Sequence, residues 1–199
     1  MKVLSLFILI SCSGCLLNAQ TLDSVDRRRI GTGLVFEAGC GLNSSASSSS
    51  ARALSTFFMG AGYHVSPRVA LWLRVYTGAA EVQHGVTRPV SGRLSLGGGG
   101  VEAAYFLNGS GAWRPFVAVG YELVTLLDES GYNGGGPRAA AGVQLNLSRF
   151  FAVNLEGQYS RRRFYNLVRF EGDASHFRPF VEHVIGGTMS FSFYPNILP

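Results

Sequence analysis

The sequence predicts an all-β protein, an eight-stranded antiparallel up-and-down transmembrane β-barrel. Three observations predict this fold class. Apolar side chains alternate with small or polar ones in eight segments, and short connections between these segments alternate with long ones. Charged residues make up only 15% of the 199 residues, whereas soluble domains carry about 25%. After the N-terminal leader, no apolar stretch reaches the roughly 18 residues that a membrane-spanning helix needs.

The N-terminal segment is typical of an export signal. A positive residue and a short apolar run precede Ala19, a small residue suited to a cleavage site. We therefore expect residues 1–19 to be a signal peptide and residues 20–199 to form the barrel domain. A second interpretation stays open, because the residues that end at Cys12 resemble the lipobox of bacterial lipoproteins, which would leave a lipid on this cysteine.

Charge and cysteine content agree with export. The chain has 17 Lys plus Arg against 12 Asp plus Glu, a net charge of +5 that falls to +4 when the leader takes Lys2 with it. This excess is modest and an exported protein meets no nucleic acid, so we expect no nucleic-acid partner. Cys12 and Cys15 leave with the leader, and Cys40 alone has no partner for an intramolecular disulfide.

The segment 69–76 shows the period of two most clearly. Its odd-numbered residues from Val69 to Val75 are all apolar, whereas the opposite face includes Trp72 and Arg74. A helix would scatter both sets around its axis, so the alternation predicts a strand. The same test predicts strands, in order, near 30–41, 53–65, 69–76, 94–107, 115–126, 138–147, 151–160 and 180–194.

The connections place the two ends of the barrel in different surroundings. Short segments rich in Pro, Gly, Ser and Asn join alternate pairs of strands and are typical of turns. They comprise 66–68, 108–114 and 148–150. The other connections are longer and polar, and we expect them to face outward from the cell, since long loops of bacterial outer-membrane barrels do so. They comprise 42–52, 79–93, 127–137 and 161–179.

The polar face of the strands predicts a crowded barrel interior. It carries isolated charges among many glycines, whereas a soluble exterior would carry abundant Lys, Glu and Thr. The predicted interior charge network comprises Glu37, Arg74, Glu102, Glu122, Arg138 and Glu156. Because buried charges need partners, we expect Arg74 to pair with Glu102, and Arg138 with Glu122, each pair on adjacent strands.

Aromatic residues predict both a filled lumen and interfacial girdles. Four rings share the polar face and should help to close an eight-stranded barrel to ions; they are Phe58, Trp72, Tyr76 and Phe116. Others gather at strand ends, where aromatic belts meet the membrane surface. These are Tyr63, Tyr105, Trp113, Phe150 and Tyr194 near the short turns, and Tyr76, Phe164 and Tyr165 near the long connections.

Together the leader, the eight alternating segments and two characteristic phrases carry a family resemblance. The phrases run over 114–121 and 151–159, and an aromatic close follows at 189–193. The chain resembles the small outer-membrane β-barrel superfamily typified by the OmpA and OmpX barrels, over nearly all of its mature length. The resemblance implies residence in the outer membrane of a Gram-negative bacterium. It also implies recognition of an aromatic last strand by the barrel-assembly machinery, although here the chain continues through 195–199.

Chemical motifs are few. His64-Val65-Ser66 superficially matches the His-x-Ser of outer-membrane lipid A deacylases, but Pro67 follows where those enzymes have Asn. Gly97 to Gly100 precedes no helix, so it is not a phosphate loop. An omptin-like protease site would need His183 together with acids; the available ones are Asp128, Glu129 and Glu182. The remaining histidines, His84 and His176, have no metal-ligand spacing, so we expect neither a metal nor another cofactor.

The last long connection is basic and aromatic. Its arginines could bind the phosphates of lipopolysaccharide through their planar guanidinium groups; they are Arg161, Arg162, Arg163, Arg169 and Arg178. The alternative is a solvated segment that Glu171 and Asp173 partly neutralise.

We therefore expect a monomeric, non-enzymatic barrel with a structural or surface-binding role, in contact with outer-membrane lipid and lipopolysaccharide. Two alternatives stay open. One is an enzyme on the same scaffold that acts on lipid A or surface peptides, and the other is a soluble, calyx-like ligand carrier in the periplasm.

Overall fold

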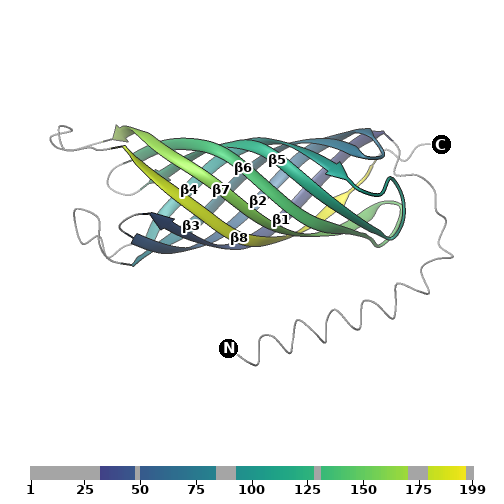
Figure 1. The fold of residues 1–199 in the computed structure, drawn as a ribbon, viewed down its shortest axis with the longest axis horizontal. Helices are drawn as coiled ribbons and strands as arrows, with labels where there is room; N and C mark the ends of the chain where they lie inside the picture. Colours follow the sequence, from purple (N-terminus) through teal and green to yellow (C-terminus); the bar gives the residue numbers. More distant parts are fainter. Residues whose placement is uncertain (1–31, 48–49, 84–92, 128–130, 170–178, 196–199) are drawn as a thin grey trace, which may run out of the picture.

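The computed structural model describes residues 32–47, 50–83, 93–127, 131–169 and 179–195 (Figure 1). They form eight antiparallel strands, and each pairs with its neighbours in the sequence. The strands are β1 (Gly33–Ser47), β2 (Ser50–Ser66), β3 (Val69–Gln83), β4 (Arg93–Phe106), β5 (Trp113–Leu127), β6 (Gly131–Asn146), β7 (Phe151–Arg169) and β8 (Phe180–Phe193). Pairing of β1 with β8 closes the barrel, which confirms the predicted fold class.

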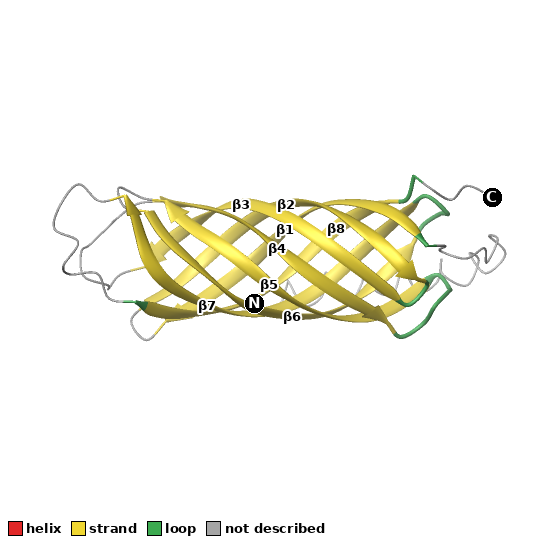
Figure 2. Cartoon of the chain, turned by 90° about the horizontal axis from the view of Figure 1, so that it is seen from above, coloured by secondary structure: helices red, strands yellow, loops and turns green. Residues whose placement is uncertain are grey.

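Three short turns lie at one end of the barrel, which we call the turn end (Figure 2). They connect β2 to β3, β4 to β5 and β6 to β7 at the predicted positions. We call the opposite end the far end. No helix among the described residues is long and apolar enough to cross a membrane. The predicted leader, with Ala19 and Cys12, lies outside the described residues.

The strands reach much further toward the far end than predicted. β1 and β2 continue through most of 42–52, which was expected to be a loop, and pair up to Ser47 and Ser50. β3 continues to Gln83 and β7 to Arg169. The prediction of four wholly irregular long connections was therefore wrong. Backbone pairing needs no apolar face. The Ser, Gly and Ala of the β1, β2 and β3 extensions, and the three consecutive arginines of the β7 extension, hide the alternation on which the prediction relied.

The outer wall is apolar from the turn end to just past the middle of the strands. Large side chains point outward there, among them Leu42 at 77% exposure, Ile185 at 65% and Val119 at 64%. Along β7 this band runs from Phe151 to Tyr159, a span of about 27 Å at 3.4 Å per residue. Tilted strands shorten this to roughly 20 Å, close to the apolar band of about 25 Å in membrane barrels.

Large interior side chains lie opposite glycines of the neighbouring strand. Gly62 pairs with Trp72 across β2 and β3, and a Cβ atom at Gly62 would lie 2.6 Å from the indole ring. Gly142 pairs with Phe116 in the same way, with 2.8 Å between such a Cβ atom and the ring. Three further pairs follow the same rule: Gly39 with Phe58, Gly98 with Tyr76, and Gly134 with Phe164. Small residues opposite large ones thus let the lumen fill without collisions.

The predicted aromatic girdles are only partly correct. Tyr63 and Tyr105 at the turn end and Tyr165 at the far end point outward with exposures between 44% and 53%. Tyr194 and Phe164 are instead buried inside the barrel. Tyr76 also points inward, as its hydrogen bond to a lumen carboxylate shows. Position near a strand end therefore did not decide between the outer wall and the lumen.

Candidate functional site: the closed lumen

The middle of the lumen holds a group of charged side chains, which we call the charge layer. It consists of Glu37 on β1, Arg74 on β3, Glu102 on β4, Arg138 on β6 and Glu156 on β7. The side chains of its members are at most 12% exposed. The sequence analysis placed all five in the interior, and in the structure their side chains lie in the lumen.

Arg74 contacts three carboxylates at once. Its Nη2 lies 3.0 Å from Glu37, and its Nη1 lies 3.2 Å from Glu102 and 3.4 Å from Glu156. The guanidinium also stands over the Phe58 ring at 5.3 Å from the ring centroid. The predicted pair of Arg74 with Glu102 is confirmed, but it is one contact of three.

Arg138 bridges Glu102 and Glu156, so both arginines share these two carboxylates. The predicted pair of Arg138 with Glu122 was wrong. Adjacent strands were taken as the criterion for pairing, but an arginine side chain is long enough to cross the narrow lumen of an eight-stranded barrel. Contacts therefore form between β6 and β4 and between β6 and β7, and the choice of partner depends on depth along the barrel axis.

Glu122 pairs instead with Arg162 of β7. The Nε atom of Arg162 lies 2.6 Å from one carboxylate oxygen, and its Nη2 lies 3.3 Å from the other, which makes a fork-shaped pair. Arg162 is only 4% exposed. Its assignment to an external lipopolysaccharide-binding segment was therefore wrong, because β7 continues past Ser160 and keeps even-numbered residues inside.

Neutral polar groups complete the coordination of the charge layer. Asn154 donates to Glu37 at 3.0 Å, and Ser190 also donates to Glu37. Arg138 donates from Nε to Gln158 at 2.8 Å, and Gln158 in turn donates to Asn43 at 2.6 Å. These contacts reduce the cost of burying the charges, since an unmatched ion in a low-dielectric interior costs several kcal/mol.

The turn end of the lumen is closed by rings around one further arginine. Arg114 is fully buried, and its guanidinium lies 4.0 Å from the centroid of Phe106. It donates to Gln144 at 2.7 Å and to the backbone oxygens of Asn108 and Pro67. No carboxylate among the described residues forms an ion pair with it. We call Arg114, Phe106, Gln144, His64 and Tyr194 the turn-end plug.

Tyr194 follows the last strand and closes this plug. Its hydroxyl accepts a hydrogen bond of 2.7 Å from Gln144. Burial raises the pKa of Tyr194 to about 12, so the hydroxyl stays neutral at ordinary pH. The His64 ring packs 5.4 Å from Phe106 and 5.7 Å from Tyr194, measured between ring centroids.

Apolar side chains fill the lumen toward the far end. They form one cluster: Leu54, Leu96, Val124, Leu126, Phe164 and Val184. Beside the charge layer lies a small cavity of about 50 Å³, lined by Arg74, Glu102 and Arg138 of that layer and by Glu122 and Arg162. A cavity of this size has room for a few water molecules, because each water needs about 10–15 Å³.

Among the described residues, the side chains of the catalytic motifs considered from the sequence do not come together. His64 lies inside β2 between two rings, and neither of its ring nitrogens has a hydrogen-bond partner. Glu182 is 2% exposed inside the lumen, whereas the adjacent His183 points outward to the Tyr159 hydroxyl at 2.7 Å. The remaining candidates, Asp128, Glu129, His84 and His176, lie outside the described residues.

Metal-ligating side chains do not gather in the described part of the chain: no group of three or more His, Cys, Asp or Glu residues could hold an ion there.

The other arginines of the predicted lipopolysaccharide-binding set are divided. Arg161 and Arg163 are exposed on the outer face of β7, one on either side of the buried Arg162. β7 ends at Arg169. The side chain of Arg169 and the whole of Arg178 lie outside the part of the chain that the structure describes.

Sequence reasoning missed three interior charges, Arg114, Arg162 and Glu182. A usable signal existed for two of them. Arg114 and Phe116 are both even-numbered, as are Arg162 and Glu156, so the members of each pair point to the same side of a strand. Extending each predicted strand by one or two residues would have placed both arginines inside.

Comparisons with known proteins agree with this architecture. No protein-family profile matches the sequence, and no curated protein is similar to it. Solved structures do match. Neisserial surface protein A (NspA) superposes with a TM-score of 0.56 at 13% identity, covering 79% of this chain and 96% of NspA. The outer membrane protein OprG from Pseudomonas aeruginosa gives a TM-score of 0.52 at 10% identity, covering 82% of this chain and 98% of OprG.

A third structure, outer membrane protein AlkL in lipid bilayers, gives a TM-score of 0.53 at 13% identity, covering 89% of this chain and 98% of AlkL. At such low identities the likeness concerns the fold. The chain therefore has the fold of the small eight-stranded outer-membrane β-barrels.

Proposed function

We propose that this chain is an integral outer-membrane protein of a Gram-negative bacterium, a monomeric barrel with a closed lumen and a non-enzymatic structural or surface-binding role. The observation that carries the proposal is the filling of the lumen. Three successive layers cross it: the turn-end plug, the charge layer and the apolar cluster of the far end. An aqueous pore would need a continuous polar passage, which such layers leave no room for.

Placement in a membrane is supported by the distribution of side chains. Among the residues whose side chains the structure describes, all carboxylates lie inside the barrel. Large apolar residues cover the outer wall. A soluble calyx-like carrier would reverse this arrangement and keep an apolar cavity inside. Resistance of the membrane-associated protein to sodium carbonate washing tests the placement, and recovery in the soluble fraction would reject it.

Conductance tests the closed lumen. Purified protein reconstituted in planar bilayers should show no stable, large conductance under an applied potential. Arg74→Ala combined with Arg138→Ala, refolded and checked for heat-modifiable migration on gels, serves as the opened control. A large steady current from the unmodified protein would contradict the proposal.

Orientation is a further part of the proposal. We expect the far end to face outside the cell and the turn end to face the periplasm. In a Cys40→Ser background, a cysteine at Ser47 should react with an impermeant maleimide in intact cells, and one at Ser110 should react only after lysis. The opposite pattern would invert the topology.

Absence of enzymatic activity is part of the proposal as well. The most relevant alternative acts on lipid A, so mass spectrometry of lipid A from wild-type and deletion strains is the test. Identical profiles are expected, and an altered number of acyl chains would favour the enzyme.

A further inference from the structure

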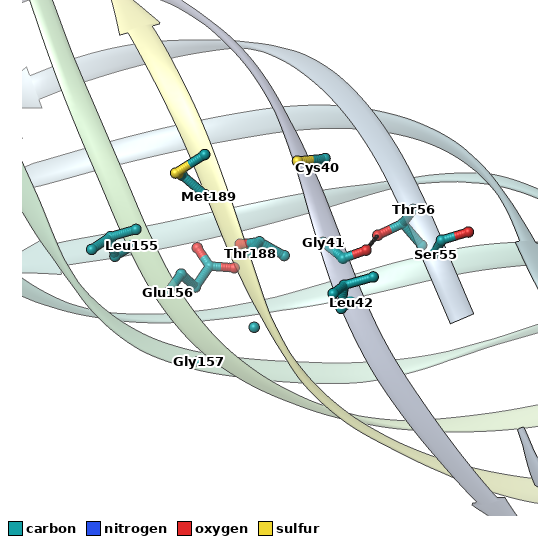
Figure 3. Close-up of a pocket in the computed structure, with 11 residues that line it drawn as sticks. Cys40, Gly41, Leu42, Ser55, Thr56, Leu155, Glu156, Gly157, Thr188 and Met189 are labelled. Atoms are coloured by element: carbon teal, nitrogen blue, oxygen red, sulfur yellow. Dashed lines mark hydrogen bonds between the residues drawn. The ribbon is translucent and has the colours of Figure 1, made fainter. Parts of the chain in front are cut away.

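The outer wall carries two features that meet on strands β7 and β8. One is an open depression of about 720 Å³ in the apolar wall (Figure 3). Its floor contains Gly157 and Gly187, which pair directly with each other. Outward side chains surround this floor: Cys40, Leu42, Leu155 and Met189. The depression is thus apolar and opens toward the surroundings of the barrel.

The second feature is cationic and lies further toward the far end. Arg161 pairs with His183, four residues beyond the pair of Gly157 and Gly187 on each strand. Arg163 follows on the same outer face, about 7 Å further along the strand. No described residue forms an ion pair with Arg161 or Arg163, although every arginine of the charge layer has at least two carboxylates.

The position of these arginines relative to the apolar band matters. An outward arginine at the middle of a bilayer costs about 2–4 kcal/mol, and the cost falls to about 0–1 kcal/mol at the interface. On β7 the apolar band ends at Tyr159, two residues before Arg161, and the next large outward ring, Tyr165, comes two residues after Arg163. Arg161 and Arg163 therefore lie where lipid headgroups begin, and the depression lies where acyl chains are.

The sidedness of the two arginines is set from within the lumen. Arg162 between them is held inside by its forked pair with Glu122. Because side chains alternate along a strand, this contact forces Arg161 and Arg163 to point outward. The three consecutive arginines are therefore one internal anchor and two external ligand groups.

We propose that this face binds one phosphorylated, multiply acylated lipid of the lipid A type. Arg161 and Arg163 bind its phosphate groups, and one acyl chain occupies the depression over Gly157 and Gly187. The proposal rests on the outer-membrane placement proposed above and names the lipid that this part of the wall selects. Guanidinium groups suit phosphates because they offer several donors in a planar fork.

The test uses the purified full-length mature barrel in detergent micelles, with lipid binding followed by native mass spectrometry. The probes are bisphosphorylated lipid A and the same lipid after enzymatic dephosphorylation. Arg161→Gln with Arg163→Gln should weaken lipid A binding by about tenfold or more, equivalent to the loss of at least one charge-assisted contact. Dephosphorylated lipid A should bind the unmodified protein as weakly as lipid A binds this variant.

Matched controls separate specific binding from net charge. Arg68→Gln with Arg149→Gln removes two exposed arginines from turns at the opposite end, so it makes the same change of charge. This control should change lipid A binding by less than about twofold. Arg161→Lys with Arg163→Lys keeps the charge but loses the fork, and should give an intermediate affinity.

Filling the depression tests the acyl-chain part. A Cβ atom at Gly157 or Gly187 would meet no atom closer than 3.9 Å or 3.6 Å, so larger residues extend outward without disturbing the fold. Gly157→Leu with Gly187→Leu should weaken lipid A binding severalfold while heat-modifiable migration on gels is retained.

Three outcomes would overturn the proposal. The first is equal lipid A binding by the Arg161 and Arg163 variant and by the turn-end control. The second is equal binding of phosphorylated and dephosphorylated lipid A. The third is full competition by inorganic phosphate at millimolar concentration together with no effect of the leucine variant, which would assign the site to free phosphate. A soluble protein in the carbonate test would instead reject the outer-membrane placement, independently of these binding results.

Discussion

Arg74 and Arg114 are both buried in the lumen, but their partners differ in kind. Arg74 in the charge layer contacts three carboxylates. Arg114 in the turn-end plug contacts backbone oxygens, one amide and the face of a ring. The turn end offers free carbonyl groups because strand pairing stops there, whereas mid-strand carbonyls are already used by the sheet. Position along the barrel axis thus decides whether a buried arginine needs acids.

The largest expected effect comes from removing Arg74. Arg74→Met leaves Glu37, Glu102 and Glu156 with one fewer cation and should lower the free energy of unfolding by about 3–5 kcal/mol. Glu37→Gln should cost clearly less, because Arg74 keeps two carboxylates. Urea unfolding in lipid vesicles, followed by tryptophan fluorescence, measures both. Equal losses of unfolding free energy for the two single variants would contradict a shared network. A smaller loss in the double variant Arg74→Met with Glu37→Gln than in Arg74→Met alone would support the network.

A double-mutant cycle on Glu122 sharpens the assignment of partners. Glu122→Gln combined with Arg162→Met should show a coupling energy of about 1–3 kcal/mol, because the two groups form a forked contact. The matched cycle that combines Glu122→Gln with Arg138→Met should show a coupling energy below about 0.5 kcal/mol. A reversed order would restore the pairing expected from strand adjacency.

Removal of the turn-end arginine should have a smaller effect than removal of Arg74. Arg114→Met leaves only neutral groups without a donor, and these can turn to solvent near the barrel mouth, so we expect a loss of about 1–2 kcal/mol. The same urea assay applies. A loss as large as that for Arg74→Met would show that the two arginines are not held differently.

The smallest expected effect concerns alkaline pH and Tyr194. Its pKa of about 12 in the barrel exceeds the ordinary value near 10. The unfolded chain therefore loses this proton first, and stability that is fully present below pH 10 should fall as pH rises toward 12. Tyr194→Phe should flatten this part of the curve of unfolding free energy against pH. An unchanged slope would place the titration elsewhere.

The barrel and most of its interior charges were predictable because parity is a strong signal in the apolar half of each strand. Arg74 and Glu102 stand among apolar neighbours of opposite parity, so their sidedness follows directly. Arg162 has arginines on both sides, which hides the alternation and makes the segment resemble a basic loop. Sidedness there depends on Glu122, a residue 40 positions away in the sequence.

Partners across the lumen were less predictable than sidedness. Strand order and parity place Arg138 and Glu122 on adjacent strands, but the residues that meet are those at equal depth in a tilted barrel. That depth depends on the stagger between strands: Arg138 pairs with Gly120, and Glu122 pairs with Gly136, so the two charges lie at different depths. A single sequence contains no direct record of this stagger.

Each interior ring lies against the glycine opposite it, so neither of the two residues could be replaced by a larger one alone. Trp72 needs Gly62, and Phe116 needs Gly142, because a methyl group at either glycine would meet the ring. During evolution such pairs should be inherited as units: related chains would keep both members, exchange them between strands, or replace both together. The same coupling favours the correct strand pairing at Phe116, since a slip of two residues in either direction would place its ring opposite Ala140 or Gln144 instead of Gly142.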